Sequence, residues 1–184
     1  MPTRNTFVRS LHDLGLAAWF GGTLMGTIGL NGAAATARSP QERLEISARG
    51  WSRWFPLQLA AMAAHGIGGI GLIAGNKTRL VGQRESRQNT VVKTAVTLLA
   101  IGTSLGSGIA GKVMGDHTQE GADGVTEPDA SSSRQLATAQ RVQRVLQWTT
   151  PALTAVLIVL AAQQGEQQRP IKGLFRTTVD NFRR

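Results

Sequence analysis

The sequence predicts an all-α integral membrane protein, a bundle of four transmembrane helices that forms one domain over residues 1–184. Four stretches of 18 to 24 residues contain no Asp, Glu, Lys or Arg. A helix needs roughly 20 apolar residues to cross about 30 Å of hydrocarbon, so each stretch is long enough to span a bilayer. The charged residues are concentrated in the segments between the stretches, as expected for membrane helices and their connections. The predicted spans are 14–37, 54–76, 94–111 and 145–165.

The first predicted span, 14–37, is rich in Gly and Ala and follows a short basic tail. This region also resembles a secretory signal, because Arg4 and Arg9 precede an apolar run and an Ala-Thr-Ala sequence occupies 35–37. The apolar run is longer than the roughly 7–15 residues of such signals, which favours a retained span. Cleavage there would leave three spans.

The second predicted span, 54–76, follows a link of mixed charge over 38–53. Within this link, Ser39, Pro40 and Glu42 have the pattern of a helix start, in which a serine caps the helix and proline takes its first position. Trp51 and Trp54 come where a chain that enters a bilayer often places its aromatic anchors. We therefore expect a short helix that leads to the membrane surface.

The link before the third span, 94–111, is strongly basic. Its cations are expected to contact anionic lipid head groups at the membrane surface. The residues predicted to do so are Lys77, Arg79, Arg84 and Arg87.

The long link before the fourth span, 145–165, has two halves. Residues 112–130 are acidic and contain Gly and Pro, so we predict an irregular loop outside the cytoplasm. Residues 131–144 repeat apolar side chains at spacings of three and four, which predicts an amphipathic helix that continues into the span. Pro151 is expected to kink the joined helix near the membrane surface.

The distribution of basic residues predicts the orientation. With four spans, one side of the membrane carries 12 of the 20 Lys and Arg residues and includes both termini. Because the cytoplasmic side of membrane proteins is enriched in these residues, both termini are expected in the cytoplasm. The abundance of Ala, Gly and Arg is typical of a GC-rich bacterial genome, so the expected location is the bacterial inner (plasma) membrane.

Several function classes lack the residues that they require. The chain has no Cys and no Tyr, which excludes disulfides, thiolate metal sites and catalysis by either side chain. It also lacks a nucleophile elbow, a Walker loop and an H-E-x-x-H motif, so no enzymatic activity is expected. The net charge of +9 arises from residues that flank the spans, which favours anionic lipids over nucleic acid as the partner.

Glycines recur inside the predicted spans at the spacing of close helix packing. Small residues four positions apart let two helices approach closely in lipid. They are expected either to pack the bundle itself or to leave one face free for a partner helix. A G-x-G-x-x-G sequence at 66–71 lies within a predicted span, without a preceding strand, so we assign it to packing and not to nucleotide binding. The helix-packing pairs are Gly22 with Gly26, Gly71 with Gly75, and Gly102 with Gly106.

His65 is the main candidate for chemistry because it lies within the second predicted span. Ionisable groups there are costly and usually face the interior of the bundle, where a histidine can bind copper or haem iron or relay a proton. A neutral histidine that hydrogen-bonds a neighbouring helix is the alternative. His12, beside Asp13, is a second possible ligand or an interfacial pair. The predicted topology separates His12 and His65 by roughly 15 Å in depth, so we expect no haem between them.

The run from His12 through Trp19 to Gly21 and Gly22 resembles the first span of the copper-resistance D type of inner-membrane protein. This resemblance covers about eleven residues and implies copper uptake or handling, with His12 as the residue that transfers. The chain departs from that family in having four predicted spans, few histidines and no cluster of methionines.

Abundant packing signals and scarce chemical groups together predict a non-enzymatic function. We expect an accessory or assembly subunit of a membrane complex that binds another membrane protein, or a second copy of itself, and holds no cofactor. The alternative is a protein that binds or transports copper, haem or protons, centred on His65.

Overall fold

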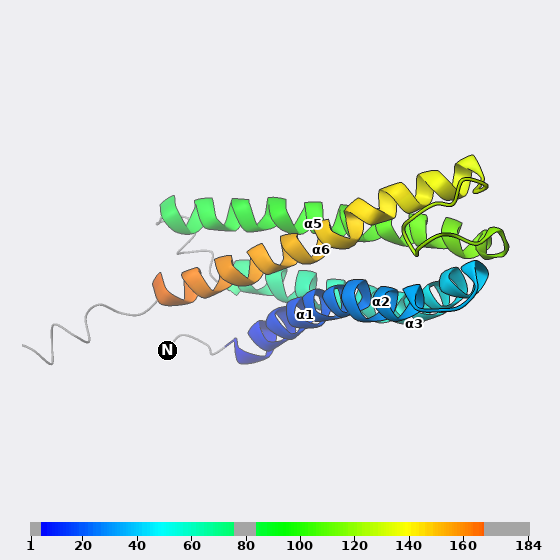
Figure 1. Cartoon of the computed structure of the whole chain (residues 1–184). Helices are drawn as coiled ribbons and strands as arrows, with labels where there is room; N and C mark the ends of the chain where they lie inside the picture. The colour runs from blue at the N-terminus through cyan, green and yellow to red at the C-terminus, as the bar shows by residue number, and fades with distance from the viewer. Residues whose placement is uncertain (1–4, 76–83, 168–184) are drawn as a thin grey trace, which may run out of the picture.

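The computed structural model describes residues 5–75 and 84–167, in which the chain forms two helical hairpins (Figure 1). The described parts contain helices and no strand, which confirms the all-α prediction for them. In the first hairpin, helix α1 leads through a π-helical turn, η1, into the short helix α2, and α3 returns beside them. These elements are α1 (Thr6–Met25), η1 (Gly26–Leu30), α2 (Asn31–Ala35) and α3 (Pro40–Gly75).

The second hairpin pairs α5 with α6 through a structured connection. Helix α5 runs over Arg84–Asp116, the 3-10 turn η2 over Thr118–Glu120 and α6 over Arg134–Gln167. The start of α1, the end of α3, the start of α5 and the end of α6 lie at one end of the bundle, while both hairpin connections lie at the other (Figure 1). Helix α1 packs mainly on α3, α5 on α6, and each hairpin contacts the other along α1–α6 and α3–α5.

Three of the described helices are long and apolar enough to cross a membrane. They lie within Pro40–Gly75, Arg87–Asp116 and Arg134–Gln163. Many of their Leu, Ile and Val side chains are exposed on the outside of the bundle, where lipid would cover them. The first helical segment, interrupted by η1, is not among the three. The described residues therefore form a helical bundle with three helices fit to cross a membrane.

The prediction of a link over 38–53 is wrong, because α3 begins at Pro40 and stays helical to Gly75. The predicted start is present: the Ser39 hydroxyl accepts a hydrogen bond of 3.0 Å from the backbone N–H of Glu42. The helix continues because its first turns have tertiary partners. Leu44 is 1% exposed and packs with residues of α2, α5 and α6, so burial sustains a segment whose charges had suggested a link.

The prediction of an irregular loop over 112–130 is wrong for its first residues, which are helical, and the rest of the segment is ordered. Helix α5 continues to Asp116, and the connection that follows is packed against the bundle. Ala122 and Val125 are 0% and 4% exposed within an apolar cluster that includes Leu44. Gly121 has a φ of +74°, a conformation that side chains other than glycine rarely adopt. The composition of this connection resembled that of a solvated loop because the few residues that anchor it are small and scattered.

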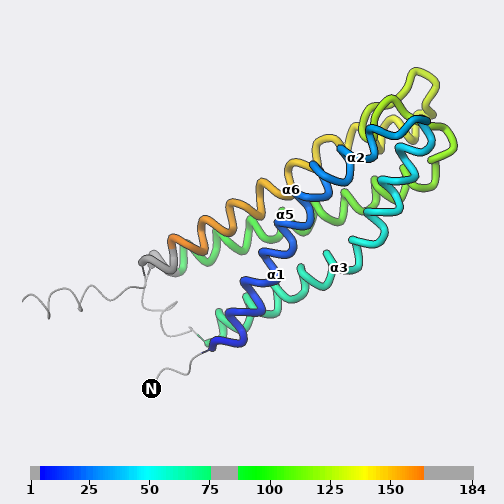
Figure 2. Tube along the Cα trace, turned by 60° about the horizontal axis from the view of Figure 1, so that its bottom comes forward, coloured from blue at the N-terminus to red at the C-terminus, as the bar shows by residue number. Residues whose placement is uncertain are grey.

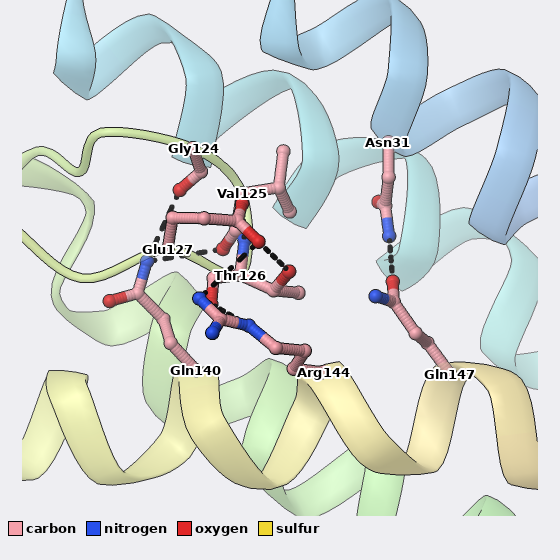
Figure 3. A network of polar contacts seen from close by, with 8 residues as sticks. All are labelled: Asn31, Gly124, Val125, Thr126, Glu127, Gln140, Arg144 and Gln147. Carbon is pink, nitrogen blue, oxygen red and sulfur yellow. Dashed lines mark hydrogen bonds and ion pairs between the residues drawn. The ribbon is translucent and has the colours of Figure 1, made fainter.

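Hydrogen bonds to backbone carbonyls hold this connection onto α6 (Figure 3). The Gln140 amide donates to the carbonyls of Gly124 and Val125 at 3.3 and 3.1 Å. The Arg144 guanidinium donates to the carbonyl of Thr126 at 2.8 Å and lies 3.4 Å from the Glu127 carboxylate. Helix α6 therefore begins as a support for the connection before it enters the apolar part of the bundle.

The predicted amphipathic helix over 131–144 and the fourth span form one element, since α6 runs from Arg134 through Pro151 without interruption. Leu136 and Ala139 face the core as predicted, whereas Val142 is 43% exposed. Gln140 is buried instead. The core-facing side of α6 therefore carries a polar side chain, where the spacing of apolar residues predicted Val142.

Candidate functional site

The centre of the bundle is unusually polar for a helical membrane protein. Side chains of all four long helical segments contribute buried hydroxyl and amide groups. In hydrocarbon such groups are costly unless they hydrogen-bond within the protein, so they are candidates for function. The buried polar residues of the apolar segments include Thr23, Thr27, Asn31, Ser47, Gln58, His65, Ser104, Gln143, Thr150 and Thr154.

Asn31 connects three helices. Its amide nitrogen donates to the side-chain oxygen of Gln147 at 2.9 Å (Figure 3). Its oxygen accepts hydrogen bonds from the Ser47 hydroxyl at 3.0 Å and from the Trp51 indole N–H at 2.8 Å. Asn31 follows the π-helical turn, which shifts the helix register by one residue, and it directs its amide toward α3 and α6 at once.

Hydrogen bonds also cross between the remaining helices. The Trp19 indole donates to the Ser104 hydroxyl at 3.0 Å and so joins the two hairpins. Ser107 donates to the Gln143 side chain at 3.0 Å, and a second hydroxyl pair on the same two helices lies one turn deeper. The polar core thus runs as a continuous column between α1, α3, α5 and α6.

A cavity of about 990 Å³ opens beside this column. Its walls combine apolar side chains, such as Phe55 and Leu146, with the polar groups of Asn31, Ser107 and Gln147. Gln58 also lines it and is 4% exposed, yet its side chain forms no hydrogen bond with any other residue that the structure describes.

The histidines meet at the opposite end of the polar column. The ring centres of His12 and His65 are 4.1 Å apart with planes inclined by 37°. The Nδ1–H of His65 donates to the backbone carbonyl of His12 at 3.2 Å, and Nδ1 of His12 lies 2.9 Å from the Asp13 carboxylate. The Trp19 ring contacts His65 edge-on at 6.1 Å. Because the His12 carbonyl can only accept, Nδ1 of His65 carries the hydrogen of this bond.

The expectation that His12 and His65 differ by roughly 15 Å in depth is wrong. Because the first hairpin turns at residues 36–39, α1 runs antiparallel to α3 from the start of α3 (Figure 2). Gly15 meets the backbone of Ala61 and His65, so the residues around His12 lie at the level of His65. The expectation failed because it measured depth from the charge-free stretches and treated 38–53 as a link.

The contact between the rings does not fit a haem held between them. A metal–nitrogen bond is about 2 Å, so two imidazoles on opposite sides of one iron have their nitrogens about 4 Å apart and their ring centres farther out. The observed 4.1 Å between ring centres is too short for this arrangement. Among the described residues, no group of three or more His, Cys, Asp or Glu side chains is placed to hold a metal ion.

A smaller cavity of about 330 Å³ lies beside the histidines. It is lined by Arg9, His12, Asp13 and Lys93 together with apolar residues of α1, α3 and α6. Arg9, His12 and Asp13 belong to the first hairpin and Lys93 to the second, so ionisable groups of both hairpins line this cavity.

Most of the predicted packing glycines lie on the seam between α1 and α3. A Cβ atom at Gly22 would overlap the Trp54 ring, one at Gly26 would overlap Trp51, and one at Gly71 would meet Val8 at 2.6 Å. Gly75 faces Asn5 in the same way, and Gly106 lies beside Leu146, on the seam of the second hairpin. A Cβ atom at Gly102 would meet nothing within 4 Å, so this glycine faces away from the bundle.

The basic residues predicted to contact lipid head groups fall at the end of the bundle that carries the start of α5. Arg84 begins α5, and Arg87 is exposed on its first turn. Lys77 and Arg79 lie outside the described residues.

Comparison with protein-family models, with curated proteins and with solved structures gives no match for this chain.

Reasoning from the sequence missed the amides of the polar core because neutral residues do not interrupt a charge-free stretch. A signal was present in α6, where polar residues recur at alternating spacings of three and four along one face. They are Gln140, Gln143, Gln147, Thr150 and Thr154.

Proposed function

We propose that the chain is a four-span protein of the bacterial inner membrane, with both termini in the cytoplasm, that acts as a non-enzymatic accessory subunit of a membrane complex. The arrangement of the helix ends supports this topology, because the start of α1 and the end of α6 share one end of the bundle. The cytoplasmic position rests on the sequence, in which the segments assigned to that side of a four-span topology carry 12 of the 20 Lys and Arg residues.

An exposed apolar stripe on α5 is the observation that carries the accessory role. Its residues are spaced alternately by four and three positions, which is the spacing of a helix face that packs on another helix. Gly102 lies in the middle of the stripe with open space before it, so a second helix can approach closely there. The stripe consists of Val91, Ala95, Leu98, Gly102, Leu105 and Ile109, all exposed.

Quantitative co-purification from native membranes in mild detergent tests this role. We expect a stoichiometric membrane partner, or a dimer of the chain itself, whose recovery falls at least tenfold in Gly102→Leu. Gly21→Leu is the matched control, because a Cβ atom at Gly21 also meets nothing within 4 Å. A chain that purifies alone, or a partner retained equally by both variants, would contradict the accessory role.

The contact between His12 and His65 favours a second candidate, a protein that binds and relays protons. The two rings and the Asp13 carboxylate connect the exposed surface to a buried imidazole. Proton flux in vesicles, followed with an internal pH-sensitive dye, should disappear in His65→Gln and persist in His117→Gln. Flux equal to that of empty vesicles would exclude this candidate. Copper or haem as the ligand of His65 remains an expectation that metal analysis and a visible spectrum of the same sample would test.

A further inference from the structure

The large cavity between α3 and α5 has a lining that the accessory role uses only at Leu105 and Ile109. Its volume of about 990 Å³ is at the upper end of the range of small-molecule sites, about 300–1,000 Å³. The cavity borders the core between the two hairpins, and its lining extends from the polar column to the outer face of the bundle. It therefore has both an inner, polar wall and an outer, apolar one.

The cavity reaches the surface between α3 and α5. The residues at this edge are exposed: Ser52 and Pro56 on α3, and Leu105 and Ile109 on α5. Pro56, Leu105 and Ile109 lie within charge-free stretches, so we place this part of the opening in the apolar layer of the membrane. A molecule dissolved in the bilayer can therefore reach the cavity sideways. The exposed Arg49, Lys112 and Asp116 line the other end of the cavity.

Gln58 supplies the polar end of the site. It is 4% exposed and lines the cavity, and its amide has no hydrogen-bond partner among the described residues. A buried amide without a partner is costly, and nearly all such groups in folded proteins are satisfied. The neighbouring amides and hydroxyls of Asn31 and Ser107 are already occupied by bonds within the protein. The Gln58 amide is therefore left for a ligand, together with the side-chain nitrogens of Gln143 and Gln147, whose side-chain hydrogen bonds use only their oxygens.

The charges of the lining exclude an ionic ligand. Arg49, Lys112 and Asp116 are the only charged residues among those that line it, and their side chains are 58–76% exposed at one end. Arg49 pairs with Glu45 at 3.2 Å, and Lys112 pairs with Asp116 at 2.7 Å. A charged head group beside Gln58 would be desolvated without a counter-charge.

We propose that this cavity binds an uncharged amphiphile from the bilayer, with its hydroxyl, carbonyl or amide head on Gln58 and its apolar body between Phe55, Leu105 and Ile109. The site is complete within one copy of the chain and can be tested without a partner, although Leu105 and Ile109 also belong to the α5 stripe proposed to bind a partner helix.

Photolabelling of the purified full-length chain in phosphatidylcholine vesicles tests the site. The probe is a hexadecanol with a diazirine in its chain. We expect saturable labelling of peptides around Phe55–Gln58 on α3 and Leu105–Ile109 on α5. Unlabelled hexadecanol should compete at least ten times better than hexadecyl phosphate, which has the same tail and a charged head. Labelling that rises linearly with probe, or equal competition by the two compounds, would overturn the proposal.

Two variants separate binding from stability. Gln58→Leu removes one hydrogen-bonding group and should weaken saturable labelling about fivefold. It should also raise the thermal midpoint of the empty protein by about 2–4 °C, because an unpaired buried amide is replaced by an apolar side chain of similar size. The exposed Gln163→Leu is the matched control and should change neither quantity. A lower midpoint in Gln58→Leu with unchanged labelling would show a structural role and overturn the proposal.

Discussion

The seam between α1 and α3 and the seam between α3 and α5 are built in opposite ways. Along the first, glycines of each helix receive the backbone or the ring of the other, as Gly15 does at Ala61 and Gly68 does at His12. Along the second, α3 and α5 meet less extensively, and the space between them is a cavity with an unpaired amide. One helix, α3, thus makes a closed contact on one side and an open one on the other. The small residues thus close one side of α3 against α1, while the other side of α3 borders the cavity.

The largest effect is expected where the closed seam is broken. A Cβ atom at Gly68 would lie 2.5 Å from the backbone nitrogen of His12, and backbone atoms on both sides cannot move away easily. We expect Gly68→Ala to reduce the free energy of unfolding by about 3 kcal/mol. Unfolding in mixed detergent measures this change.

Gly66→Ala is the control for that variant. It lies on the same helix, where a Cβ atom would meet nothing within 4 Å. Alanine is favoured over glycine in a helix by about 0.5–1 kcal/mol, so this variant should be slightly more stable than the wild type. Equal destabilisation by both variants would mean that the seam is not the cause.

The next largest effect is expected at Asn31, which hydrogen-bonds three side chains and lines the cavity. Replacing Asn31 with Leu leaves the Ser47 hydroxyl, the Trp51 indole and the Gln147 amide without their partner. We expect a loss of about 2 kcal/mol in the free energy of unfolding, because buried donors that lose their acceptor keep their desolvation cost. Thr149→Val is the control, since its exposed hydroxyl bonds only its own helix. A loss no greater than that of the control would mean that water replaces the network.

A smaller effect is expected at the single hydrogen bond that Trp19 of α1 makes with α5. Trp19 is fully buried and donates to Ser104 at 3.0 Å. A double-mutant cycle with Trp19→Phe and Ser104→Ala should give a coupling energy of about 1 kcal/mol. Additive effects of the two substitutions would show that packing and not this bond joins the hairpins.

The smallest effect is expected at the connection, far from both seams. The Glu120 carboxylate accepts a hydrogen bond of 2.7 Å from the backbone N–H of Ser133, and this bond lowers the pKa of Glu120 below its ordinary value of 4.5. Because the folded pKa is the lower one, the stabilisation is present above about pH 4.5 and is lost as the pH falls through the folded value. The protection factor of the Ser133 amide, in which the intrinsic pH dependence of exchange is divided out, should therefore fall on acidification.

Glu120→Gln is the control for this acid sensitivity. The amide oxygen can still accept the Ser133 hydrogen bond but does not titrate, so exchange at Ser133 should no longer respond specifically to acid below pH 4.5. The same acid response in wild type and variant would assign it to another group of the connection.

Local features of the fold could be predicted from the sequence. The helix start at Ser39 and Pro40 was visible because a cap depends on residues three positions apart. The membrane character of α3, α5 and α6 was visible because it depends on the length of each apolar stretch. The length of α3 was not, because its first turns are held by apolar contacts of Leu44 with distant segments.

The candidate sites depended on information that the sequence holds only indirectly. His65 was identified as an unusual residue, but its neighbour His12 was placed at the wrong depth, since the register of α1 on α3 is set by where the hairpin turns. Gln58 was overlooked because an amide in an apolar stretch has no significance until its partners, or their absence, are known.

The sequence by itself determined that this is an all-helical protein with helices fit for a membrane, because hydrophobic length, caps and glycine spacing act within one segment. Only the tertiary structure decided that His12 touches His65, that the glycines close the seam between α1 and α3, and that Gln58 lines a cavity. These contacts join residues more than twenty positions apart, and their register follows from the packing of whole helices and not from the preference of any one of them.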